Sequence, residues 1–282
     1  MKEFFEFSIL EKHAQLVFAE GESKGGVFAR RVCLEQGDPR IARIAEIDRN
    51  IHRSDGGRLF YSFDIRRIYS NGEIENAELF HLIISPTSYF DPAGEECGTL
   101  YDSRPACDYC GSGALQAGPL ILQPKRIPKG VDIAVTIAGE IVVSKRMGDT
   151  LNSTDLVGLD LSPVFQWKAD ELVEVDWYQW TPVPPFVEIV SPTKVASSPF
   201  DDDADNAFRC PNGDNLGLNL ISEVSISAAS VVPADFLASR QFIGRRLGLL
   251  RPTRVLFLTQ KARGILNANG FRGFTLEVAR LV

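Results

Sequence analysis

The chain lacks any long apolar run. No stretch approaches the roughly 20 consecutive apolar residues that a membrane-spanning helix needs, so we expect no membrane span. The first residues, MKEFFEFSILEKH, are too acidic, and their apolar part too short, for a secretory signal. The sequence therefore predicts a cytoplasmic protein, in which cysteines stay reduced.

An excess of positive charge is also missing. Lys and Arg number 30 against 37 Asp and Glu, which gives a formal net charge of −7. This balance argues against a general nucleic-acid or anionic-membrane surface, because both need a basic face. It suits a protein whose partner is basic. With 44% hydrophobic and 24% charged residues, the 282-residue chain has the composition of a globular protein with a sizeable core.

Known catalytic motifs are absent from the sequence as well. The three histidines, His13, His52 and His81, stand outside any H-E-x-x-H arrangement. There is no G-x-S-x-G, no phosphate-binding Gly-Lys-Ser/Thr loop and no G-x-G-x-x-G after a strand. Nothing in the sequence therefore points to a dedicated catalytic site.

Five cysteines, an odd number, fit reduced thiols or a metal better than a disulfide framework. In Cys107-Asp108-Tyr109-Cys110-Gly111, two thiolates separated by two residues can hold one metal ion from a tight turn. Cys97 and Cys210 are the natural remaining pair, so the sequence predicts a structural zinc on Cys97, Cys107, Cys110 and Cys210. Two alternatives stay open. The cysteines are ordinary apolar residues, or 107 and 110 form a redox pair, which the lack of a strand feeding C-x-x-C into a helix disfavours.

Other charged groups have competing interpretations. The segment Cys210-Pro211-Asn212-Gly213-Asp214 lacks a second cysteine, and Asp214 is either a ligand or a turn residue. The acidic run 201–205 fits a solvated linker better than a calcium or magnesium loop, because the glycine and distal glutamate of an EF-hand are missing. A basic cluster can bind an anion or a partner, or pair with the chain's own carboxylates: Arg240, Arg245, Arg246, Arg251 and Arg254.

The most informative positive feature is an internal repeat. Residues 141–161 align without a gap on residues 256–276. Each copy has the pattern of a strand, a helix and a strand, with Ser144 and Thr259 as the helix N-caps. Asp132 and Asp235 stand in comparable places ahead of the two copies. Four positions are identical: Leu151 and Leu266, Asn152 and Asn267, Gly158 and Gly273, Leu161 and Leu276.

These patterns predict an α+β fold in three parts. An N-terminal α/β segment covers residues 1–95, and the first repeat unit, with the C-x-x-C, covers 96–180. A Pro-rich linker and the second, degenerate unit cover 181–282. Within the first part, RLFYSFDIRRIY predicts a strand. Ser70 and Glu73 have capping-box spacing, so the following ENAELFHLII, which contains His81, is expected to be helical.

Three motifs carry a family resemblance: Thr99-Leu100-Tyr101-Asp102, Ala106-Cys107-Asp108-Tyr109-Cys110-Gly111 and the repeated S/T-x-K/R…L-N…G-L/F pattern. Through them, residues 95–282 resemble the bacterial double-CXXCG motif family. More loosely, they look like immunity proteins of polymorphic toxin systems, whose C-terminal halves carry a similar strand–helix–strand end. The chain departs from the double motif at Cys210-Pro211-Asn212-Gly213. The resemblance implies toxin neutralisation by analogy, since the double-CXXCG family offers no activity to transfer.

Our sequence-based hypothesis is a non-catalytic cytoplasmic protein-binding protein, of immunity type, whose acidic surface occludes a basic, nuclease-like toxin. The alternative is a metal-dependent hydrolase that uses the cysteine-bound zinc with Asp132, Asp235 or His81. It predicts an open coordination position in a pocket, which a closed four-sulfur site would exclude. A regulator that binds nucleic acid through Arg245 and Arg246 is disfavoured by the negative net charge.

Overall fold

The computed structural model describes residues 1–19, 28–201, 208–217 and 219–282. The chain divides into two compact units, one of residues 1–74 with 198–202 and the other of residues 75–197 with 203–282. Strands and helices are both present, and the fold is α+β. Among the described residues, no helix combines the length and the apolarity that crossing a membrane requires.

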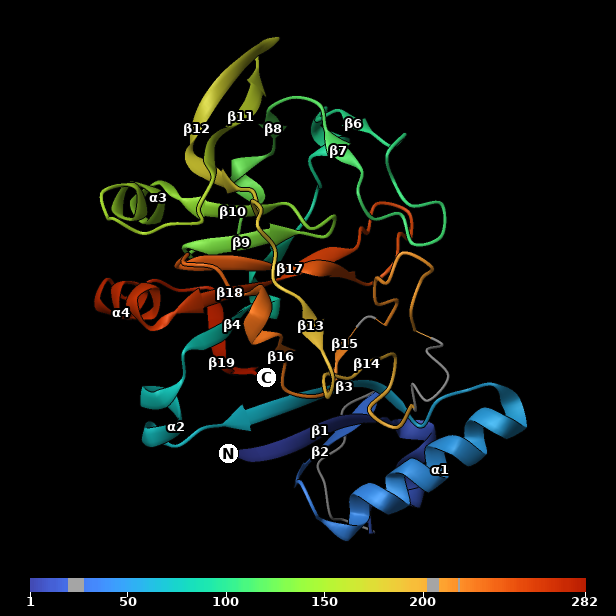
Figure 1. Cartoon of the computed structure of the whole chain (residues 1–282). Helices are drawn as coiled ribbons and strands as arrows, with labels where there is room; N and C mark the ends of the chain where they lie inside the picture. The colour runs from blue at the N-terminus through green and yellow to red at the C-terminus, as the bar shows by residue number, and fades with distance from the viewer. Residues whose placement is uncertain (20–27, 202–207, 218) are drawn as a thin grey trace. The chain divides into compact units, whose positions relative to one another are not determined.

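The first unit is an antiparallel sheet of order β2-β1-β3, against which the helix α1 packs (Figure 1). Asp38 caps α1 by accepting the N–H of Arg40, and Pro39 opens the helix. The predicted strand in RLFYSFDIRRIY is confirmed as β3. The elements are β1 (Lys2–Leu10), β2 (Ala29–Glu35), α1 (Pro39–Asp55) and β3 (Phe60–Ile68). The buried core consists of Phe7, Ile9, Leu34, Ile44, Leu59 and Phe60.

The prediction that the helix extends through His81 is wrong. The capping box of Ser70 and Glu73 forms, but the helix it starts, α2 (Asn71–Asn76), spans six residues. The run that follows is a strand, β4 (Leu79–Ile84), which pairs on one side with β18 (Thr253–Thr259) and on the other with β19 (Phe274–Leu281). A short apolar run is compatible with a buried strand as well as with a helix, and here pairing with the two flanking strands determines that it is a strand.

The predicted N-terminal segment reached residue 95. Because β4 pairs with strands from the C-terminal end of the chain, the N-terminal stretch of the first unit ends at Ile74 instead. The second unit contains two six-stranded sheets, of order β5-β9-β10-β12-β11-β8 and β13-β16-β19-β4-β18-β17. Their further strands are β5 (Tyr89–Phe90), β8 (Leu120–Ile121), β9 (Ile133–Thr136), β10 (Ile141–Ser144), β11 (Leu161–Lys168), β12 (Glu171–Trp180), β13 (Ile189–Val190), β16 (Ser225–Ile226) and β17 (Phe236–Ile243). Two short ladders join β6 (Tyr101–Asp102) to β7 (Leu115–Gln116) and β14 (Val195–Ala196) to β15 (Asn219–Leu220).

Segments 141–161 and 256–276 contain the same succession of elements. β10 leads into α3 (Lys145–Asn152) and then β11, and β18 leads into α4 (Gln260–Ala268) and then β19. The hydroxyl of Ser144 accepts the N–H of Met147, and that of Thr259 accepts the N–H of Ala262, so both predicted N-caps are confirmed. Figure 1 shows the two helices on the same side of the second unit.

The Pro-rich segment after β12 is packed over part of its length. Val187 is fully buried and donates its N–H to Ala238, and the guanidinium of Arg254 lies 3.8 Å from the centroid of the Phe186 ring. Of the acidic run 201–205, only Asp201 is among the described residues, so the linker interpretation of that run lies outside them.

Candidate metal centre

Three of the four cysteines predicted as ligands come together in the second unit. The Sγ atoms of Cys107, Cys110 and Cys210 all lie within 4.8 Å of one another. Tetrahedral bonds of about 2.3 Å place two sulfur ligands roughly 3.8 Å apart. The three thiols are therefore close enough to bind one metal ion.

Two tight turns position these thiols. In the first turn, between β6 and β7, Gly111 donates its N–H to the carbonyl of Cys107, and Cys107 donates its own N–H to Ser112, both at 2.7 Å. In the second turn, Gly213 donates its N–H to the carbonyl of Cys210 at 2.9 Å. The cysteines that these two turns carry are separated by about 100 residues in the sequence, and the fold brings them together.

The environment of the thiols differs from one to the next. Cys110 and Cys210 are buried, whereas Cys107 is half-buried. The backbone N–H groups of Cys110 and Tyr109 lower the pKa of Cys107 because they favour its thiolate. Burial raises the pKa of Cys110 to about 12. Cys110 therefore needs a nearby cation before it can lose its proton at neutral pH.

The carboxylate of Asp214 lies against the buried thiols. Asp214 is 7% exposed, and its Oδ2 atom is 3.5 Å from the Sγ of Cys110 and 3.8 Å from the Sγ of Cys210. The Ser112 hydroxyl donates to the same oxygen at 2.7 Å, and the N–H of Phe242 donates to Oδ1 at 2.9 Å. From the sequence, Asp214 could be interpreted either as a metal ligand or as a turn residue. The feature that points to a ligand is its position four residues after Cys210.

The fourth predicted ligand, Cys97, is not in the group that the structure brings together from the described residues. Burial, and then the charges of Glu96 and Glu140, raise the pKa of its thiol, and a hydrogen bond from the backbone of Gln123 only partly offsets them. The hydroxyl of Thr99 accepts the N–H of Ile121 at 2.8 Å and so holds the turn after Cys97 beside β8. Spacing along the sequence does not reveal that Cys97 lies outside the group.

Two of the carboxylates considered for a hydrolase connect the two strand–helix–strand segments instead. Asp132, ahead of the first segment, accepts the N–H of Arg272 in the second segment at 3.0 Å. Asp235, ahead of the second segment, accepts the N–H of Val157 in the first segment at 3.1 Å. Each also accepts the N-cap hydroxyl of the helix that follows it, at 2.8 and 2.9 Å. The two carboxylates thus make equivalent, reciprocal contacts.

The third residue considered for a hydrolase, His81, is buried in β4, where the centroid of its ring lies 6.0 Å from that of Phe257. Neither His81 nor the two carboxylates, Asp132 and Asp235, belongs to the cysteine group found in the described part of the chain. The structure therefore does not bring the hydrolase residues together around the thiols.

The basic cluster is largely engaged within the second unit. Arg240 and Arg251 form ion pairs with glutamates of that unit. Arg254 lies over two aromatic rings, and the guanidinium of Arg246 donates to the carbonyl of Gly248 and to the hydroxyl of Ser103. Arg245 is exposed. Internal contacts thus account for four of the five arginines.

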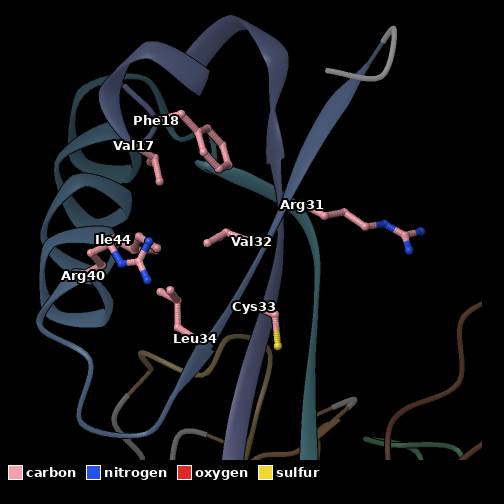
Figure 2. Close-up of a pocket in the computed structure, with 8 residues that line it drawn as sticks. All are labelled: Val17, Phe18, Arg31, Val32, Cys33, Leu34, Arg40 and Ile44. Atoms are coloured by element: carbon pink, nitrogen blue, oxygen red, sulfur yellow. The ribbon is translucent and has the colours of Figure 1, made fainter. Parts of the chain in front are cut away.

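The first unit contains a cavity of about 230 Å³ between β2 and α1. Figure 2 shows the side chains of Val32 and Leu34 on the α1 side of β2, while Arg31 points to the opposite side. The guanidinium of Arg40, at the start of α1, forms an ion pair with Asp38. The cavity is thus mainly apolar on its α1 side, and its lining contains none of the three clustered cysteines.

Comparison with protein-family models found no match, and comparison with curated protein sequences found none either. The case for a metal centre therefore depends on the geometry of this chain itself.

Proposed function

We propose that this protein is a non-catalytic binding protein of immunity type, which binds and occludes a basic, toxin-like protein. In this proposal a structural zinc ion cross-links two turns of its scaffold. The observation that carries the binding proposal is a projecting acidic ribbon formed by β11 and β12. A reducing compartment such as the cytoplasm would keep the cysteines available to the metal.

The ribbon consists of residues 166–176. β10 pairs with β12 only from Trp177 onward, and β8 pairs with β11 only at Val164 and Phe165. Among the described residues, the two strands of the ribbon therefore pair only with each other, and the ribbon extends beyond the neighbouring strands (Figure 1). A two-stranded ribbon gains little stability alone, so a projecting one suits contact with another molecule.

The surface of the ribbon combines apolar and acidic side chains. Trp167 and Leu172 are cross-strand partners and are 53% and 40% exposed. The exposed carboxylates of the ribbon form no ion pair with any described residue: Asp170, Glu171, Glu174 and Asp176. An exposed aromatic side chain on a ribbon that carries four carboxylates against one lysine, Lys168, is complementary to a basic protein surface.

The metal supports this function by holding the scaffold. Cys107 and Cys110 come from one turn and Cys210 from another, far along the chain. A metal ion bound to all three would cross-link the two turns. Sulfur-rich, buried sites of this kind are typical of structural zinc.

We interpret the scaffold as a repeat of two related strand–helix–strand segments, 141–161 and 256–276. Support comes from the reciprocal contacts of Asp132 and Asp235 and from the matching N-caps, Ser144 and Thr259.

The test is to identify any toxin-like gene adjacent to this protein's gene, to co-express its product with this protein, and to titrate the purified pair. We expect the wild type to protect cells and the ribbon variant Glu171→Lys/Glu174→Lys to lose protection and bind at least about tenfold more weakly. The matched control, Glu75→Lys/Glu78→Lys, changes net charge equally at exposed positions outside the ribbon. No protection by the wild type, or equal loss in both variants, overturns the proposal.

One observation favours the alternative, a metal-dependent hydrolase. Three sulfur ligands leave one tetrahedral position, and catalytic zinc sites keep one position for water. The contacts of Asp132, Asp235 and His81 supply no general base at that position. Zinc-dependent hydrolysis of ester or phosphoester test substrates, abolished by Cys210→Ser, would support this alternative, and its absence removes it.

A further inference from the structure

The two cysteine turns differ by one residue. In the first turn the N–H of Cys107 bonds the carbonyl of Ser112, five positions later, and in the second the N–H of Cys210 bonds that of Asp214, four positions later. A glycine with positive φ precedes the closing residue in each turn, at 79° in Gly111 and 84° in Gly213. Gly213 therefore corresponds to Gly111, and Asp214 corresponds to Ser112.

By this correspondence, the second turn is one residue shorter between its cysteine and its glycine, and it has no counterpart of the Cys110 thiol. It has a carboxylate where the first turn has a hydroxyl. That carboxylate is buried, and it lies 3.5 and 3.8 Å from the sulfur atoms of Cys110 and Cys210. Ligands at about 2.0 Å for oxygen and 2.3 Å for sulfur in a tetrahedral site stand roughly 3.5 Å apart. The observed separations match that geometry.

The contacts around Asp214 support the same assignment. The hydroxyl of Ser112 and the N–H of Phe242 orient the Asp214 carboxylate, as outer contacts orient metal ligands. Asp214 is outside the group whose ligand atoms all lie within 4.8 Å, so its Oδ2 atom must move toward Cys107 when an ion binds.

We propose that Asp214 is the fourth ligand of a divalent-metal site with Cys107, Cys110 and Cys210. The inference rests on metal binding by the three cysteines, which forms part of the proposed function. It closes the tetrahedral position that a hydrolase would need for water, and it assigns a carboxylate to the role of the missing cysteine.

The test uses the purified full-length chain, titrated with Zn²⁺ against a chromophoric chelator and with Co²⁺ by absorption spectroscopy. We expect Asp214→Asn to weaken zinc binding by at least about tenfold while a stoichiometry of one ion per chain remains. Asp108→Asn is the matched control, because it removes the same charge from an exposed position in the first turn. It should leave the affinity unchanged.

A purely structural role for Asp214 would also lower affinity, so a second variant separates the two. Asp214→Cys supplies a ligand but a poorer hydrogen-bond acceptor. We expect it to retain wild-type affinity and to raise the thiolate-to-cobalt charge-transfer absorption by about one third, as three thiolates become four.

Wild-type affinity in Asp214→Asn, or an unchanged cobalt spectrum in Asp214→Cys, overturns the assignment of Asp214 and leaves the three-cysteine site standing. If the wild type binds no zinc, or binds it as well as Cys210→Ser does, the metal site and the Asp214 assignment both fall. Circular dichroism of each variant establishes that it folds. If Asp214→Asn does not fold, the cobalt spectrum of Asp214→Cys decides.

Discussion

At the scale of single residues, two glycines determine how closely the two strand–helix–strand segments approach. A Cβ atom at Gly158 would lie 2.0 Å from the carbonyl oxygen of Phe236, and one at Gly273 would lie 2.3 Å from that of Ile133. Both glycines have positive φ, 97° and 108°. The glycines that align in the sequence thus make equivalent backbone contacts, because Phe236 begins β17, which pairs with β18, and Ile133 begins β9, which pairs with β10.

Gly158→Ala should destabilise the protein by roughly 3 kcal/mol or more, because neither a positive φ nor a backbone clash can be relieved by a side-chain rotation. Gly264→Ala is the control. Its Cβ would meet no atom within 4 Å in α4, so the substitution should stabilise the helix by about 1 kcal/mol. Urea denaturation measures both free energies of unfolding. Similar midpoints for the two variants would show that the close approach is absent.

The cysteines should differ in reactivity in the metal-free protein. Backbone N–H groups lower the pKa of Cys107, and burial raises that of Cys110 to about 12. At pH 7.5 we expect iodoacetamide to alkylate Cys107 before Cys110, because the thiolate is the nucleophile.

Peptide mass spectrometry over a time course gives the order of alkylation, and prior addition of Zn²⁺ should protect both cysteines. As pH falls, protons compete for the thiolates, so this protection should weaken with decreasing pH. Faster modification of Cys110 would contradict the burial on which the site depends.

At the scale of elements, the ribbon carries a strained turn. Ala169 and Asp170 connect β11 to β12 with φ of 48° and 67°. A two-residue hairpin with positive φ at both positions favours Asn-Gly. The double substitution Ala169→Asn/Asp170→Gly should stabilise the protein by about 0.5–1 kcal/mol.

Thermal unfolding followed by circular dichroism measures this gain, with Asp64→Asn on β3 as an exposed control outside the ribbon. Because the ribbon pairs only with itself, its amides should also exchange with solvent faster than those of β10. Protection of the ribbon equal to that of β10 would mean that another surface covers it.

The helices and strands also show which structural features could be predicted from the sequence. Ser144 and Thr259 were predictable as N-caps, because a cap depends on residues within one helical turn. The run containing His81 was not, because the first four residues of β4, Leu79–Leu82, are all buried in a strand between β18 and β19. Those partners lie more than 170 residues away along the chain.

At the scale of the whole molecule, metal removal should lower stability. An ion that binds the folded state at 1,000 times its dissociation constant contributes about 4 kcal/mol. For a protein of this size, that corresponds to a fall of roughly 10 °C in the unfolding temperature after treatment with a chelator. Differential scanning calorimetry with and without Zn²⁺ measures it.

Cys210→Ser is the control for this experiment, because it removes the thiolate that the second turn supplies to the site. Its unfolding temperature should not respond to zinc or to the chelator. An equal response in the wild type and Cys210→Ser would place the stabilising ion elsewhere in the molecule.

By itself the sequence determined the local features of this protein: two helix caps, a tight turn bearing Cys107 and Cys110, and the strand in 60–68. These depend on residues a few positions apart, whose geometry the backbone fixes. Only the tertiary structure decided that Cys210 joins the site, that Cys97 does not, and that Asp214 faces the thiols. The contact between Cys110 and Asp214 spans 104 positions. Contacts at that separation are set by how the sheets pack and not by spacing along the chain.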